Sequence, residues 1–227
     1  LPLTGVRILD LSRLLPGPYG TLLLANLGAE IIKVESPDGG DYLRTTPPFI
    51  GEESAHFLAL NPGKKSLALD LKHPQGLAAF LRLVSTADAL LESFKPGTAE
   101  RLGIGYEAIK AVNPRLVYCS LSGYGQTGPY RERAGHDLNY IALAGLLGLT
   151  GQRDGPPIIP GVQVGDLAGG MAAAIGILAG ILAARSTGQG RYLDVSMYDV
   201  VRSWLGAHAV PCYRAAGQTP GREDLPH

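Results

Sequence analysis

The chain has 227 residues, of which 45% are hydrophobic and 18% charged, as in an ordinary globular protein. Its 20 basic and 20 acidic residues cancel, which argues against a nucleic-acid binder, since such proteins carry a basic excess or stripe. The two cysteines, Cys119 and Cys212, have no partner at metal or redox spacing. This excludes a disulfide scaffold and favours a reducing, cytoplasmic location.

Patterns typical of strands and helices alternate along the chain. Strands are expected at 6–11, 30–35, 66–71, 88–92, 116–121 and 191–195. Helices are expected at 19–27, 73–87, 98–102, 106–112 and 137–147, from about 166, and at 198–216 with a break at Pro211. The alternation predicts an α/β fold, a Rossmann-like, mostly parallel sheet with helices on both faces. Residues 37–63, rich in Pro, Gly, Asp and Thr, are expected to form one long loop.

Residues 167–184 carry no charge and include Gly176 and Gly180. Their length is at the lower limit for crossing a bilayer, and most of them are Ala and Gly. Strand and helix patterns continue on both sides of the segment. We therefore expect a helix buried in the protein core, whose small residues allow close packing, rather than a membrane span.

The sequence Gly-Tyr-Gly-Gln-Thr-Gly at 123–128 follows an expected strand. A dinucleotide site needs a helix to begin at such a loop, with its N–H groups facing the pyrophosphate. Residues 129–133 have no apolar periodicity, so a glycine-rich turn is expected instead. No histidine or cysteine set has the spacing of a metal site, and no metal is expected.

Two polar residues stand where a loop meets a helix, His136 and Asp166. A helix start favours a neutral imidazole, which is able to act as a base, and Asp166 is followed closely by two glycines that leave room for a ligand. Each also has a structural explanation: His136 happens to begin a helix, and Asp166 caps one. The local patterns alone favour these structural explanations.

A series of stretches, including Gly-Tyr-Gly-Gln-Thr-Gly-Pro at 123–129, resembles the family III CoA-transferases, most closely the α-methylacyl-CoA racemases. The matching stretches run in order along nearly the whole chain, at 3–11, 17–18, 27–30, 70–72, 94–97, 100–103, 113–116, 123–129 and 188–190. In this family an aspartate before a glycine-containing helix is the central catalytic group, and Asp166 occupies that place. The resemblance implies that it is a nucleophile in transferases and one of two bases in racemases.

Racemases of the family carry a histidine in a Gly-His-Asp-x-Asn-Tyr stretch, which matches residues 135–140. The resemblance therefore implies an acyl-CoA racemase, in which His136 and Asp166 invert the α-carbon of 2-methylacyl-CoA thioesters by proton transfer through an enolate. The alternative is a CoA-transferase that moves CoA between carboxylic acids, with Asp166 as the nucleophile. A third alternative is a non-catalytic acyl-CoA binding protein.

The resemblance also implies where CoA lies, and CoA is then part of the substrate, with no further cofactor expected. The residues at matching positions are Leu69, Asp70, Leu71, Lys72, Ser93, Phe94, Lys95, Arg101, Gly135, Asp137, Leu138, Asn139 and Tyr140. Lys72 and Arg101 are expected to face phosphates. Arg13 is a further active-site candidate. Many relatives carry an arginine near the adenine where this chain reads Glu-Ser-Pro at 35–37, so the adenine contacts are expected to differ.

Members of the family are considerably longer and form interlocked homodimers. The resemblance implies that a second, small domain and, in racemases, a glutamate that supports the histidine come from sequence beyond residue 227. We therefore expect residues 1–227 to be the large CoA-binding α/β domain of an incomplete chain. The expected partners are an acyl-CoA substrate and a second copy of the chain, without nucleic acid and without a membrane span.

Overall fold

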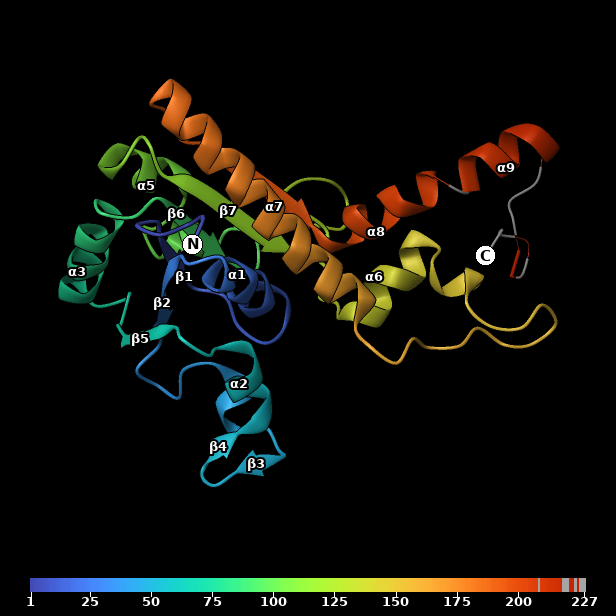
Figure 1. Cartoon of the computed structure of the whole chain (residues 1–227), viewed down its shortest axis with the longest axis horizontal. Coiled ribbons are helices and arrows are strands. Elements are labelled where there is room, and N and C mark those ends of the chain that lie inside the picture. Colours follow the sequence, from blue (N-terminus) through green and yellow to red (C-terminus); the bar gives the residue numbers. More distant parts are fainter. Residues whose placement is uncertain (208, 218–220, 223, 225–227) are drawn as a thin grey trace.

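Six parallel strands form the central sheet of the computed structural model, which describes residues 1–207, 209–217, 221–222 and 224 (Figure 1). The strands are β1 (Arg7–Asp10), β2 (Glu30–Glu35), β5 (Lys65–Ala68), β6 (Ala89–Glu92), β7 (Val117–Ser122) and β8 (Tyr192–Ser196). Their order across the sheet is β5-β2-β1-β6-β7-β8. The chain therefore winds outward in both directions from β1 and β6, and in such sheets ligands bind at the carboxyl ends of the strands, where the order reverses.

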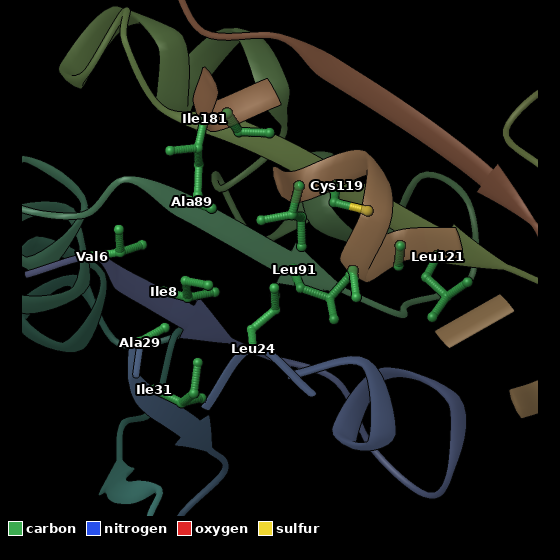
Figure 2. Close-up of a cluster of buried hydrophobic side chains, with 14 of the residues drawn as sticks. Val6, Ile8, Leu24, Ala29, Ile31, Ala89, Leu91, Cys119, Leu121 and Ile181 are labelled. Atoms are coloured by element: carbon green, nitrogen blue, oxygen red, sulfur yellow. The ribbon is translucent and has the colours of Figure 1, made fainter. Parts of the chain in front are cut away.

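Helices cover both faces of the sheet. Each central strand is apolar on both sides because it is buried on both sides: Ile8 and Leu91 face one cluster, and Leu9 and Leu90 face the other. Figure 2 shows the first cluster, which lies between the sheet and the helices α1 (Pro16–Asn26) and α7 (Val164–Thr187). The second cluster lies under α3 (Pro74–Val84), α4 (Thr98–Arg101) and α5 (Tyr106–Val112). The expected α/β fold is confirmed.

The helices α1 and α7 meet at their glycines. A Cβ atom on Gly20 would lie 2.6 Å from the carbonyl oxygen of Gly170, and one on Gly170 would clash with the carbonyl oxygen of Pro16. Only glycine permits so close an approach of two backbones. The helix α7 has the length and hydropathy of a membrane span, and half of its most apolar window is buried within the protein. These contacts agree with the expected core helix.

Residues 37–63 are not the single loop that their composition predicts. They contain a 3₁₀ helix η1 (Tyr42–Thr45), a hairpin of β3 (Phe49–Ile50) and β4 (Glu53–Ser54), and the helix α2 (Ala55–Leu60). Side chains that begin the helical turns supply the local order, since Asp41 accepts the N–H of Leu43 and Ser54 accepts that of Phe57. Such short elements have too few residues to show a period in the sequence.

The last part of the described chain forms two helices that lead away from the sheet (Figure 1). They are α8 (Met197–Gly206) and α9 (Ala209–Ala216). The prediction of a break at Pro211 was wrong, because the interruption comes earlier, and Pro211 lies in the first turn of α9, where a missing N–H leaves no bond unmade. Residue 208 lies outside the described residues. The helix α6 (Asp137–Ala144) ends at Gly145, whose φ of 98° stops it before residue 147 and the short η2 (Leu147–Leu149).

Candidate active site

A cavity of about 810 Å³ opens at the carboxyl ends of β6 and β7. Asp166 on α7 and His136 at the start of α6 both line it. The loop after β6 supplies Ser93 and Lys95, and the glycine-rich loop after β7 supplies Gly123. The sheet thus gathers residues from distant parts of the sequence at the edge where ligands bind in folds of this kind.

A second cavity, of about 310 Å³, lies beside the first at the ends of β2 and β5. Arg13, Tyr42 and Phe94 line both cavities, so the two are neighbours that share a wall. The two cavities therefore lie side by side, with these three side chains between them.

Asp166 does not cap α7. The helix begins at Val164, and the backbone N–H groups of Gly165 and Asp166 donate to Oδ1 of Asp137, at 2.6 and 3.1 Å. Asp137 is buried and belongs to α6. A side chain of another helix therefore accepts the hydrogen bonds that a capping residue of α7 would accept. The carboxylate of Asp166 is left to line the larger cavity.

The pKa of Asp166 is raised to about 6. Burial is the main cause, because it disfavours the charged carboxylate, and the negative charge of Asp137 acts in the same direction. The neighbouring His136 opposes the shift by lowering the pKa. A carboxylate with a pKa close to neutral, in a cavity, is typical of a functional group.

His136 and Tyr140 form one wall of the larger cavity. The backbone N–H of His136 donates to Oδ1 of Asn139 at 2.9 Å, which fixes the first turn of α6. The ring of Tyr140 lies against Gly123 and Gly135, where a Cβ atom would come within 2.5 and 2.8 Å of it. The hydroxyl of Tyr140 donates to the carbonyl of Gly135, and burial raises its pKa, so it stays protonated.

Most of the residues expected at the CoA site line one of the two cavities. Ser93, Lys95, Gly135, Asn139 and Tyr140 line the larger, Leu69, Asp70, Leu71 and Lys72 the smaller, and Phe94 both.

Three of the expected residues line neither cavity. Asp137 is occupied by the backbone of α7. Leu138 is 40% exposed on the surface of α6. Arg101 donates to Oγ1 of Thr98 at 2.7 Å, so it stands behind a residue of the larger cavity.

Sequence reasoning missed several residues of the larger cavity, namely Tyr42, Tyr124, Arg131, Arg133 and Met197. Signals were present for some of them: Tyr124 lies inside the glycine-rich stretch, and Tyr42 lies in segment 37–63, and loops of that length in compact domains are usually functional or disordered. Among the described residues, no group of three histidine, cysteine or carboxylate side chains is placed to hold a metal ion.

The chain belongs to CoA-transferase family III, whose sequence profile matches residues 3–227. It is 46% identical over 197 residues to a succinyl-CoA:glutarate CoA-transferase of Mus musculus, covering 86% of this chain and 45% of that protein. It is 42% identical over 222 residues to an acetyl-CoA:oxalate CoA-transferase of Acetobacter aceti, covering 97% and 57%. The chain thus spans about half the length of these relatives.

A solved structure has the same fold. The CAIB/BAIF family protein from Brucella suis superposes with a TM-score of 0.92 at 38% identity, covering 97% of this chain and 59% of that one. The family expectation is therefore confirmed. The relatives are named as CoA-transferases, which favours the transferase alternative over the racemase that the sequence put first.

Proposed function

We propose that the protein is a CoA-transferase that moves CoA between carboxylic acids, with Asp166 as the nucleophile. The observation that carries this proposal is the position of Asp166: its carboxylate is spared from capping α7 by Asp137 and lines a cavity large enough for an acyl thioester. The names of the relatives support the same reaction.

The proposed reaction begins when a carboxylate oxygen of Asp166 attacks the thioester carbonyl. The carbon–sulfur bond breaks, CoA leaves as a thiolate, and a mixed anhydride joins the acyl group to Asp166. The thiolate then attacks the Asp166 carbonyl, which releases the donor acid and leaves CoA on Asp166 as a thioester. The acceptor acid then attacks the Asp166 thioester, which releases the CoA thiolate and forms a second mixed anhydride. The thiolate attacks the acceptor's carbonyl in this anhydride, which gives the new acyl-CoA and frees the carboxylate of Asp166.

The environment of Asp166 fits this role. A carboxylate is the nucleophile only when ionised, and with a pKa of about 6 most of it is ionised at pH 7 while it remains more basic than an exposed aspartate. Half-burial limits the access of water, which would hydrolyse an anhydride. The larger cavity also presents the cations Lys95 and Arg133, which favour anionic substrates.

Small dicarboxylic acids are the proposed substrate class. Glutarate and oxalate appear in the names of two relatives, and both carry two carboxylates. The positive lining of the larger cavity supports acids with a second negative charge. The acyl-CoA racemase remains a second candidate, because His136 and Asp166 line the same cavity, as a two-base mechanism requires.

The test is to trap the intermediate on full-length enzyme. Hydroxylamine added during turnover should convert the acyl or CoA adduct into a hydroxamate on Asp166, located by peptide mass spectrometry, and the Asp166→Asn variant should show none. Steady CoA transfer without any adduct on Asp166 would refute the proposal that Asp166 is the nucleophile. His136→Ala separates the candidates: loss of α-deuterium exchange from a 2-methylacyl-CoA in heavy water supports a racemase, whereas retained CoA transfer supports a transferase.

A further inference from the structure

Arg13 stands in the wall between the two cavities, directly after β1. Its Nη1 donates to the hydroxyl of Tyr42 at 3.0 Å, and its guanidinium carbon lies 5.2 Å from the centre of the Tyr42 ring and 5.7 Å from that of Phe94. Within the described part of the chain, no carboxylate forms an ion pair with it. The guanidinium therefore has N–H groups left to bind a ligand.

A buried ion pair holds Arg13 in this place. Nζ of Lys33 lies 2.9 Å from Oδ2 of Asp41, and both side chains are 1% exposed or less. Lys33 also donates to the carbonyl of Ser12, and Asp41 accepts the N–H groups of Leu14 and Leu43. The pair thus holds the backbone of Ser12 and Leu14, on either side of Arg13, and that of Leu43, next to Tyr42.

The backbone beside Arg13 is strained. Leu14 has a φ of 61°, in the left-handed region that residues other than glycine rarely adopt. Such a conformation persists only where the surrounding bonds determine it, and it is concentrated at functional sites. The bonds from Lys33 and Asp41 are of that kind, and they hold the backbone on both sides of Arg13 beside the cavities.

We propose that Arg13 is a specificity-determining residue that binds the carboxylate at the far end of a dicarboxylic substrate, while Asp166 reacts at the near end. The inference rests on the proposed function. Both residues line the larger cavity. The planar fork of a guanidinium matches a carboxylate better than an ammonium does, and the two aromatic rings stabilise its charge without neutralising it. A monocarboxylic acid leaves this arginine unpaired and is selected against.

The test compares an acid with and without the second carboxylate, on full-length enzyme at a saturating acyl-CoA donor. Arg13→Gln should lower kcat/KM for glutarate roughly 100-fold, as expected for lost charge-assisted hydrogen bonds, and that for valerate by less than about threefold. Arg13→Lys should recover part of the loss, because the charge remains while the fork is lost. Arg82→Gln, on the exposed side of α3, is the matched control and should leave both values unchanged.

Calorimetry of glutarate and valerate binding in the presence of CoA gives a second readout that does not depend on turnover. The inference is overturned if wild-type enzyme binds both acids equally, or if Arg13→Gln weakens both acids and CoA alike, which would place the arginine at a CoA phosphate. An unchanged urea midpoint for Arg13→Gln excludes a structural cause. Absence of any CoA transfer by wild type would refute the proposed function, while the binding comparison would still decide the role of Arg13.

Discussion

The two neighbouring cavities differ in the charged side chains that line them. The larger is lined by the cations Arg13, Lys95, Arg131 and Arg133 and by one carboxylate, Asp166. The smaller is lined by the carboxylates Glu35, Asp38, Asp41 and Asp70 and by the cations Arg13 and Lys72. In the proposed function, the larger cavity attracts acids and carries the reaction, and the smaller one accepts a polar part of CoA.

Much of the negative charge in the smaller cavity is already neutralised. Glu35 accepts two hydrogen bonds from Arg44, at 2.8 and 2.7 Å, and the pKa of Glu35 is lowered to about 2 because these bonds outweigh its burial. Asp41 is paired with Lys33. The smaller cavity is thus less repulsive to an anionic ligand such as CoA than its lining residues suggest.

The largest effect is expected in the larger cavity. Asp166→Asn should lower the rate of CoA transfer by at least about 1000-fold, because an amide cannot attack a thioester in place of the carboxylate. Initial rates with purified enzyme measure this. The exposed Glu107→Gln on α5 serves as the control and should have wild-type rates. A residual rate above a tenth of the wild-type rate would show that the reaction does not depend on the carboxylate in this cavity.

The stability of the wall between the cavities is expected to depend on the buried ion pair of Lys33 and Asp41. Asp41→Asn leaves Lys33 charged and buried, which should lower the free energy of unfolding by about 3 kcal/mol. Urea unfolding checks this. The surface pairs of Glu30 with Arg7 and Lys65 provide the comparison, and Glu30→Gln should cost less than about 1 kcal/mol. Equal effects of the two substitutions would contradict a special role for the wall.

The raised pKa of Asp166 predicts how stability changes with pH. Between the ordinary aspartate value of 3.8 and about 6 the folded protein binds the proton more tightly than the unfolded chain, so this group destabilises the fold as pH rises through that range. Asp166→Asn should therefore be more stable than wild type by about 3 kcal/mol at pH 8. The advantage should vanish near pH 3, as urea titrations at both pH values would show; a constant difference would argue against the raised pKa.

The smallest effect is expected in the smaller cavity. Lys72 is exposed there, and Lys72→Gln should raise KM for acyl-CoA roughly fivefold, by removing one charge from the cofactor's binding site, with kcat unchanged. Steady-state kinetics with two acids should show the same selectivity as wild type. If selectivity changed instead, the proposed division of work between the cavities would be wrong.

The sheet could be predicted from the sequence because its central strands contain apolar runs, such as 116–119, which are typical of strands buried on both sides. The site could be predicted only in part. Whether Asp166 caps its helix depends on Asp137, 29 residues away in the sequence and on another helix. The pairing of Arg13 with Tyr42 also spans 29 residues. Local patterns do not carry such contacts, which appear only after the chain has folded.

The contact between Gly20 and Gly170 has a consequence for substrate length. The helix α1 follows the loop that carries Arg13, and α7 carries Asp166 in its first turn. Backbone meets backbone between these helices, so, with the proposed roles of Arg13 and Asp166, the side chains at this crossing leave little freedom to change the spacing of the two groups. A relative that evolves toward longer or shorter acids would have to change the reach of the side chain at position 13, while the frame that carries it stays the same.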